Sequence, residues 1–410
     1  MANQFERNLE KYAELAVKVG LNIQQGQSLW VNASIQQAPL TRFIAQKAYE
    51  AGAKSVHVEW MDDVITKLRY TLAPDDSFDT YPAWRAQAVE ELAENGGAYL
   101  LIESGNPELL QGVKPERITA YSKAAGKALV KWREYMTSYK MTWSILAAPS
   151  TGWAGKVFPD LPEDEAVAAL WEEIFKATRV DQDNPVQVWE RHNATLRTKV
   201  EELNAKQYRK LHYRAPGTEL SVTLPERHIW CGGSTVNEQG DAFNPNVPTE
   251  EVFVSPLKDG TNGVVRSTKP LSYQGNLIEN FTLTFENGRV VDFQAEKGYE
   301  ALKGLLELDE GARHLGEVAL VPHESPISAS NIIFFNTLFD ENASNHLALG
   351  KAFGFSIPDG TKMSVEELTK AGLNDSITHV DFMIGSAEMD IDGERADGTI
   401  EPIFRKGNWA

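Results

Sequence analysis

Histidine and acidic side chains occur at close spacing near the end of the chain, next to apolar residues. His379 and Asp381 are separated by one residue and are followed by the apolar run 382–384. Residues two apart in a strand project from the same face, so this pair can share one site. One imidazole and one carboxylate at this spacing form a compact half-site for a divalent metal ion. A solvent-facing polar pair on an edge strand is the alternative interpretation.

Two adjacent glutamates, Glu250 and Glu251, lie in an apolar segment that continues as Val252 and Phe253. In a strand the two carboxylates would point to opposite faces, so only one of them would line a given site. Burying a carboxylate beside apolar side chains is costly unless it is paired or binds a metal ion. Two surface acids on an edge strand explain this segment equally well when it is taken alone.

A further acid and a second histidine complete the set. Glu317 precedes the uncharged apolar run 318–321, and His346 lies a few residues after Asp340. Asp340 or Ser344 could cap a short helix from which His346 would project. Taken singly, a strand-end acid exposed to water and a structural histidine are the more ordinary interpretations.

Together these segments offer three carboxylates and two imidazoles, without a thiolate. Such ligands suit Zn, Co or Mn, and two ions need about this number of protein ligands. Two ions about 3.5–4 Å apart can hold a bridging hydroxide and polarise a carbonyl oxygen, which hydrolyses amide bonds without an activated serine. One acid must then stay unbound, or loosely bound, as the general base. Glu250 is the candidate, because Glu251 would take the metal.

The sequence contains no motif that is typical of another catalytic chemistry. It has no Gly-x-Ser-x-Gly elbow, no His-Glu-x-x-His and no glycine-rich phosphate or dinucleotide loop. The one cysteine, Cys231, excludes an intrachain disulfide and fits a reducing compartment. Another two-metal hydrolase, an amidohydrolase or a phosphoesterase, stays open. A phosphoesterase would usually need a lysine or arginine near the metals, and none lies inside the four segments, although Lys351 follows the third closely.

The elements that must position these residues differ between the two halves of the chain. The first half alternates strand and helix patterns, which is typical of a parallel sheet covered by helices. A long polar helix is predicted from Val186 to about Lys210. The other elements expected in this half are strands at 29–33, 55–60, 98–102 and 143–148, and helices from Phe5, over 40–51 and over 82–95.

The second half has the pattern of an antiparallel sheet. Alternating residues in 281–285 and 291–295 flank Asn287-Gly288, a pair that supplies the positive φ angles of a two-residue hairpin turn. We therefore expect an α/β N-terminal domain with a parallel sheet, residues 1–195. We expect an α+β C-terminal metal-binding domain with largely antiparallel sheet, residues 196–410.

The net charge and the hydropathy of the chain limit the kinds of partner that it can bind. The chain has 410 residues and a formal net charge of −18, which repels phosphate backbones and anionic lipid, so nucleic acid and membranes are not expected as partners. The apolar residues of segment 1–19 are spaced by three and four, which predicts an amphipathic helix and not a signal peptide. No stretch is apolar enough to span a bilayer. We expect a cytoplasmic protein.

The same segments resemble the thermophilic aminopeptidase family of dinuclear metallopeptidases, which includes the aminopeptidase T, aminopeptidase S and PepS-like enzymes. The likeness extends over nearly the whole chain through Trp153–Asp160 and Gly407–Ala410. Four long motifs in the same order carry it: Asn-x-Pro-Thr-Glu-Glu-Val-Phe at Asn246–Phe253, Leu-Gly-Glu-Val-Ala-Leu-Val at Leu315–Val321, Thr-Leu-Phe-Asp-Glu-Asn-Ala at Thr337–Ala343, and Ser-x-x-His-Val-Asp-Phe-Met-Ile-Gly at Ser376–Gly385.

The resemblance implies a leucyl-type aminopeptidase of broad specificity that acts on peptides with a free N-terminus. It also implies two divalent ions, often Zn or Co, a homodimer, and an N-terminal α/β domain that shapes the active-site cleft. The metal ligands implied by the motifs are Glu251, Glu317, His346, His379 and Asp381.

One position departs from the family pattern. The family has a tyrosine seven residues after the histidine ligand, implied to stabilise the tetrahedral intermediate, and this chain has Phe353 there. Loss of one oxyanion donor typically costs on the order of 10²–10³ in rate. Either another group serves, or the chain is slow. An inactive metal- or peptide-binding homologue is therefore kept as the alternative outside enzymes.

Overall fold

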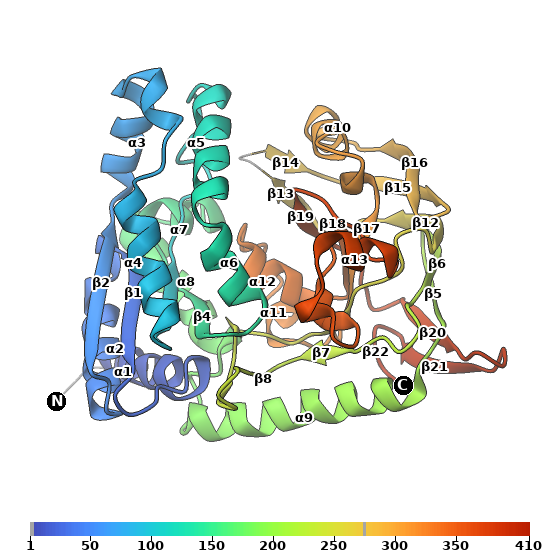
Figure 1. The fold of residues 1–410 in the computed structure, drawn as a ribbon, viewed down its shortest axis with the longest axis horizontal. Helices are drawn as coiled ribbons and strands as arrows, with labels where there is room; N and C mark the ends of the chain where they lie inside the picture. Colours follow the sequence, from blue (N-terminus) through green and yellow to red (C-terminus); the bar gives the residue numbers. More distant parts are fainter. Residues whose placement is uncertain (1–3, 274–275) are drawn as a thin grey trace. The chain divides into compact units, whose positions relative to one another are not determined.

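The computed structural model describes residues 4–273 and 276–410, and the chain forms two compact units (Figure 1). The first unit contains the residues up to His192 together with Ser234–Pro248. The second contains Asn193–Gly233 together with Thr249–Ala410. The boundary at His192 falls inside the long helix α9 (Pro185–Lys206).

The first unit is built on a parallel sheet with strand order β10-β4-β3-β1-β2. On β1, the buried Leu29, Val31 and Ala33 alternate with less buried neighbours, so one side of the strand faces covering helices. The α/β architecture predicted for this half is confirmed. Its strands are β1 (Ser28–Ser34), β2 (Ser55–Met61), β3 (Ala98–Glu103), β4 (Thr142–Ala147) and β10 (Asn246–Val247), with the short pair β8 (Thr235–Val236) and β9 (Ala242–Phe243). Its helices are α1 (Gln4–Leu15), α2 (Ala38–Glu50), α3 (Asp63–Leu72), α4 (Ala83–Glu94), α5 (Pro115–Ala128), α6 (Val130–Thr137), α7 (Thr151–Val157) and α8 (Glu163–Ala177).

The two units do not follow a single cut in the sequence. Residues 234–248 belong to the first unit, where β10 pairs in parallel with β4. The expected division into domains 1–195 and 196–410 stays a prediction as a statement about folding units. Helix α9 also ends at Lys206, a few residues before its predicted end, because Gln207 takes a positive φ of 47° and β5 follows.

The second unit contains two antiparallel sheets, as predicted for this half. A five-stranded sheet has the order β19-β18-β17-β11-β7, and an eight-stranded sheet has the order β16-β15-β12-β6-β5-β20-β21-β22 (Figure 1). The smaller sheet consists of β7 (Cys231–Gly232), β11 (Val252–Val254), β17 (Leu315–Leu320), β18 (His346–Gly350) and β19 (His379–Met383). The larger consists of β5 (Lys210–Ala215), β6 (Thr218–Thr223), β12 (Thr261–Arg266), β15 (Thr282–Glu286), β16 (Arg289–Gln294), β20 (Asp390–Glu394), β21 (Ile400–Arg405) and β22 (Asn408–Trp409). The unit also contains the pair β13 (Leu271–Tyr273) and β14 (Asn276–Ile278), and helices α10 (Tyr299–Leu306), α11 (Pro326–Ala329), α12 (Thr337–Asp340) and α13 (Val365–Lys370).

The predicted hairpin turn is confirmed. Strands β15 and β16 pair as far as Glu286 and Arg289, which leaves Asn287 and Gly288 as the two turn residues. Their φ angles are 48° and 81°, which is the geometry that favours Asn-Gly in this type of turn.

One face of the five-stranded sheet lies on the hydrophobic core of the second unit. Successive strand residues point to opposite faces, and Val318, Leu347 and Phe382 pair across β17, β18 and β19 on the core side. All three belong to the apolar cluster that also contains Leu211 and Val222 of the larger sheet. The other face of the small sheet is therefore free to carry polar side chains.

A β-bulge at Gly316 determines which face of the sheet Leu315 and Glu317 point to. Leu315 pairs with Leu349, but Glu317 pairs with Ala348, so Gly316 is an extra residue without a cross-strand partner in this register. In a regular strand Leu315 and Glu317 would share a face, because they are two residues apart. The bulge lets Leu315 enter the core while Glu317 projects from the opposite face.

Within the described residues, no helix has both the length and the apolar character needed to cross a membrane.

Substitution of Gly316 by alanine should disturb this bulge. An added Cβ would lie 2.2 Å from the carbonyl oxygen of Lys351 and 2.5 Å from that of Gly350. Both obstacles are backbone atoms, so we expect Gly316→Ala to lower the free energy of unfolding by about 1–3 kcal/mol in urea titrations. Gly304→Ala is the matched control, because nothing lies within 4 Å of its Cβ position in α10. Equal stability of the two variants would contradict the role given to the bulge.

Candidate metal centre

The polar face of the five-stranded sheet carries the residues predicted as metal ligands. On β18 and β19, His346 pairs with Met383 and Ala348 pairs with Asp381, so His346 lies on the same face as Asp381 and His379. Glu317 joins them, because its cross-strand partner is also Ala348.

Glu251 reaches the same face from the next strand. It lies two residues before Phe253 of β11, which pairs with Ala319, and Ala319 in turn pairs with His346. The alternation that was expected to separate Glu250 from Glu251 therefore selects Glu251 for this face. The structure thus brings all five predicted ligands together.

The local structure predicted for His346 was wrong. It does not project from a short helix capped by Asp340 or Ser344, but is the first residue of β18. Helix α12 ends at Asp340, and a single 3₁₀ turn over Glu341–Ala343 follows it. The strand pattern of β18 begins only at His346. The polar residues before it resemble a helix cap, which explains the wrong prediction.

The donor atoms form two groups that share Glu317. Nε2 of His346 lies 3.1 Å from Oε2 of Glu251 and 3.6 Å from Oε1 of Glu317. Nε2 of His379 lies 3.8 Å from Oε2 of Glu317 and 3.4 Å from Oδ1 of Asp381. Within each group, Glu251–Glu317–His346 and Glu317–His379–Asp381, the donor atoms lie within 4.8 Å of one another.

The surroundings of these atoms fit divalent ions. Among the described residues, the buried atoms without a hydrogen bond include Oε2 of Glu251, Nε2 of His346 and Oδ1 of Asp381. Such atoms are uncommon in native proteins, because burying a polar atom without a partner is costly. All three belong to the two groups. Carboxylate and imidazole donors that converge in this way are the ligand set of Zn, Co or Mn.

Backbone carbonyls orient both imidazoles. Nδ1 of His346 lies 3.2 Å from the carbonyl oxygen of Ser344, and Nδ1 of His379 lies 2.8 Å from that of Lys351. A carbonyl oxygen can only accept, so each Nδ1 must donate its proton. In the neutral ring this leaves the lone pair of Nε2 directed at the carboxylates, as ligand histidines require.

The titratable groups of the cluster shift one another's pKa values. Burial raises the pKa of Glu317, although His346 and His379 oppose this effect. Burial also disfavours the charged form of His346, but the adjacent carboxylates of Glu251 and Glu317 raise its pKa well above the usual value. For Asp381, burial is outweighed by His379, and its pKa is lowered. Without metal, protons on the imidazoles therefore balance part of the carboxylate charge.

Glu250, the predicted general base, is buried beside this cluster but belongs to neither group of donors. Its backbone N–H donates to Oδ1 of Asn342 at 2.7 Å, which fixes the chain next to Glu251. Its catalytic role stays a prediction.

Phe353 lies against a candidate ligand. Its ring centroid is 4.8 Å from that of His379 and 5.1 Å from that of Phe355, with which it is stacked. The ring brings an apolar surface, and no hydroxyl, to the edge of the cluster.

Sequence reasoning missed Glu341. This carboxyl is in electrostatic contact with Asp381, Glu251 and His346, and burial together with its acidic neighbours raises its pKa well above the usual value. It lies inside the motif Thr337–Ala343, but that motif was interpreted through helix capping and His346. The signal available in the sequence was that Glu341 lies two residues from Phe339 and two from Ala343, in a segment with apolar residues on both sides.

Comparison with known proteins agrees with this geometry. The family model described as "Thermophilic metalloprotease (M29)" matches residues 5–409. The chain belongs to the thermophilic metalloprotease family M29. It is 59% identical over 408 residues to aminopeptidase AmpS of Bacillus subtilis, covering 100% of both chains, and 56% identical to aminopeptidase 2 of Geobacillus stearothermophilus, covering 100% of this chain and 99% of that one. The solved structure of wild-type AmpT from Thermus thermophilus matches with a TM-score of 0.93 at 44% identity, covering 99% of this chain and 100% of that chain. The family resemblance and the fold class inferred from the sequence are confirmed.

Protonation of the histidines beside the carboxylates predicts how the stability of the metal-free chain depends on pH. Burial disfavours the charged ring of His379, but Asp381 and Glu317 outweigh it and raise its pKa to about 9. The unfolded value is about 6.5. The stabilising charge of His379 is therefore fully present below about pH 6.5 and is lost as the pH rises through about 9. Urea unfolding in EDTA should show this loss, at most about 3 kcal/mol because the ring is partly exposed.

Two controls separate this effect from general alkaline instability. His379→Gln should reduce the slope of stability against pH between 6.5 and 9. Excess Zn should remove it, because an ion then replaces the protons. A metal-free wild type whose stability stays flat over this range would show that the imidazoles do not balance the carboxylates.

Proposed function

We propose that this chain is a metal-dependent aminopeptidase that removes the N-terminal residue of peptides with a free amino terminus, using two divalent ions such as Zn, Co or Mn. The observation that carries the proposal is the pair of donor groups that share Glu317 on one sheet face. The relatives named aminopeptidases, which match over the full length of the chain, support it.

In this proposal Glu251, Glu317 and His346 hold one ion, and Glu317, His379 and Asp381 hold the other. Bound ions of this kind supply Lewis acidity toward a carbonyl oxygen and lower the pKa of water. The sheet fixes the positions of the donor atoms, and the contacts of both Nδ1 atoms with backbone carbonyls leave Nε2 of each imidazole to face the ions when they are bound. Their acidic charge offsets the charge of two divalent ions.

Glu250 is proposed to carry the proton between the attacking water and the leaving amine. It is buried next to Glu251 and is not a member of either donor group, so its carboxylate is not needed for coordination. A general base of this kind contributes about 10²–10⁴ in rate. Phe353 contributes no donor, so stabilisation of the developing oxyanion falls to other groups.

The shared carboxylate gives a stoichiometric prediction. Glu317→Gln removes a donor from both groups, so we expect the purified variant to lose both ions in metal analysis after dialysis. Glu251→Gln removes a donor from one group and should keep about one ion. Glu307→Gln, an exposed glutamate of the same unit, should keep the wild-type content. Loss of the same number of ions in the Glu317 and Glu251 variants would contradict the shared role.

The activity itself is tested with aminoacyl p-nitroanilides in Co, Zn, Mn or EDTA, with an N-acetylated control. We expect cleavage that needs metal and a free amine, and Glu250→Gln should lower kcat by about 10²-fold or more while metal content is kept. Cleavage of the acetylated substrate would favour another two-metal amidohydrolase. Bound metal with no cleavage of any substrate would favour the inactive homologue, and Phe353→Tyr would then test whether a missing donor is the cause.

Broad leucyl-type specificity, a homodimer and a cytoplasmic location complete the proposal. The substrate panel ranks the specificity. Light scattering after size exclusion measures the mass in solution, against 45.6 kDa for one chain.

A further inference from the structure

Three phenylalanine rings form a continuous row on the face of the five-stranded sheet that carries the candidate metal ligands. Phe253 of β11 lies 5.8 Å from Phe355, and Phe355 stacks on Phe353 at 5.1 Å, measured between ring centroids. Phe353 in turn lies 4.8 Å from the imidazole of His379 on β19. Because β17 and β18 lie between β11 and β19 in the sheet, this aromatic row of Phe253, Phe355 and Phe353 crosses the strands that hold the candidate ligands.

Both ends of the aromatic row lie beside the candidate metal centre. Phe253 lies two residues after Glu251 and pairs with Ala319, the cross-strand partner of His346, so strand alternation places it on the ligand-bearing face. The other end of the row contacts His379. Glu251 and His379 belong to different donor groups, so the row adjoins both groups.

The three rings are not part of the hydrophobic core. Leu347 and Phe382 belong to the large apolar cluster of this unit, Ala352 and Ile357 belong to a small one, and the three rings belong to neither. Each ring stays partly exposed. An apolar surface left open beside a few converging polar groups is typical of a ligand-binding site.

The loop that carries two of the rings is held in one conformation. The backbone N–H of Phe353 donates to Oγ of Ser255 at 2.9 Å, and the N–H of Ser255 donates to Oγ of Ser356 at 3.1 Å. Both serines are buried. A Cβ added at Gly354 would lie 2.6 Å from the carbonyl oxygen of Gly360, so the turn fits closely against its neighbours. The rings are thus arranged before a ligand binds, which lowers the entropic cost of binding.

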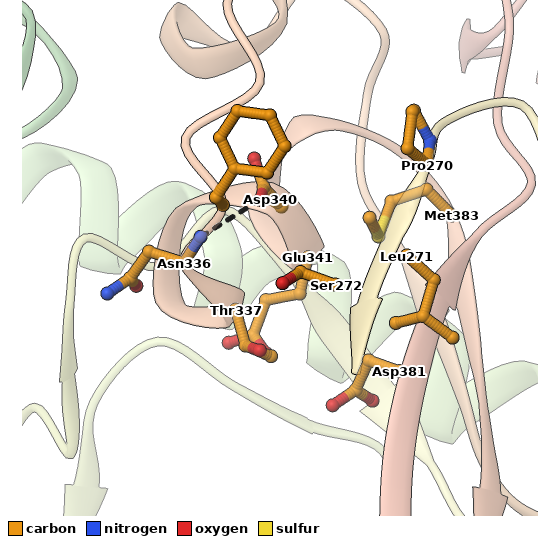
Figure 2. A pocket seen from close by; sticks show the side chains of 10 residues that line it. Pro270, Leu271, Ser272, Asn336, Thr337, Asp340, Glu341, Asp381 and Met383 are labelled. Carbon is orange, nitrogen blue, oxygen red and sulfur yellow. Dashed lines mark hydrogen bonds between the residues drawn. The ribbon is translucent and has the colours of Figure 1, made fainter. Parts of the chain in front are cut away.

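The cavity beside the centre has a different lining. Its volume is about 50 Å³, and Figure 2 shows Leu271, Met383 and the carboxylates of Glu341 and Asp381 around it. Along β19 this cavity adjoins Asp381 and Met383, whereas the aromatic row begins at His379. None of the three rings lines the cavity. The candidate metal centre therefore has an acidic flank and a separate aromatic flank.

We propose that the aromatic row holds an apolar side chain of the peptide substrate next to the scissile bond. The inference rests on the proposed aminopeptidase function and adds residues that select the substrate. Since the row adjoins both donor groups, a peptide bond that reaches the centre brings its flanking side chains to the rings. An apolar side chain gains free energy there by leaving water, whereas a polar side chain of the same size loses hydrogen bonds to water.

The first test compares leucine with asparagine, whose side chains are similar in size and differ in polarity. Aminoacyl p-nitroanilides vary the first residue, and the dipeptide amides Ala-Leu-NH₂ and Ala-Asn-NH₂ vary the second. Phe355→Ala should lower the ratio of kcat/KM for leucine over asparagine by about 10-fold or more in at least one series. The series that responds identifies the side chain that the row holds. A ratio within one variant is insensitive to a general loss of active protein.

Two further variants complete this test. Phe293→Ala is the matched control, because Phe293 of β16 is also partly exposed and is stacked on Tyr299, and it should keep both wild-type ratios. Phe253→Leu changes the other end of the row and keeps an apolar strand residue, so it should lower the same ratio even if Phe355→Ala does not fold. Wild-type ratios in both series for the row variants would overturn the proposal.

A binding measurement keeps the inference independent of turnover. Isovaleramide, an uncharged amide with a leucine-sized chain, should bind the metal-loaded wild type about 10-fold or more tightly than acetamide in saturation-transfer NMR titrations. Phe355→Ala and Phe253→Leu should each reduce this selectivity. Reduced selectivity in these variants, with no cleavage of any substrate by the wild type, would end the aminopeptidase proposal and support the aromatic row. Cleavage by the wild type, with unchanged substrate ratios and amide binding in both variants, would support the aminopeptidase and overturn the role of the row.

Discussion

The carboxylate of Glu317 lies between two imidazoles, and each of its oxygens is within 4 Å of one of them. Buried with Glu251 on one side and Asp381 on the other, it concentrates negative charge where water cannot screen it. Such an arrangement is stable only if positive charge enters it, from protons on the histidines or from metal ions. The other features of the site follow from this requirement: imidazoles on the neighbouring strands, carbonyl groups that orient their Nδ1 atoms, and an apolar second face that anchors the sheet.

The sheet satisfies two opposite demands through strand alternation. Val318, Leu347 and Phe382 hold one face in the hydrophobic core while the residues between them carry charge on the other. The bulge at Gly316 is the point where strict alternation would have failed, since Leu315 and Glu317 would otherwise share a face. A small adjustment of the backbone thus lets a core strand contribute Glu317 to the candidate metal centre.

Much of this could be predicted from the sequence, because strand periodicity and turn chemistry are local. His379 and Asp381 were paired from their spacing, the Asn287–Gly288 turn from its residue types, and the parallel and antiparallel halves from their patterns. His346 was placed on a helix because the polar residues before β18 resemble a cap, and only the pairing of β18 with β17 and β19 decides for a strand. Glu341 was missed for a related reason. Its importance comes from neighbours that are distant in sequence, and the cavity between β13, α12 and β19 exists only once those elements are packed.

The strand β10 has a consequence for how the molecule can be divided. The first unit takes its outermost parallel strand from residues 246–247, which follow the start of the second unit in the sequence. A fragment that stops at residue 195 would leave the backbone groups of β4 along this edge without their partner, and an open edge of this kind invites pairing with other chains. Only three residues lie between Val247 and Glu251. The segment that completes the first sheet thus runs directly into the segment that carries Glu251 in the second unit, so cutting the protein into contiguous halves would separate β10 from the sheet that it completes.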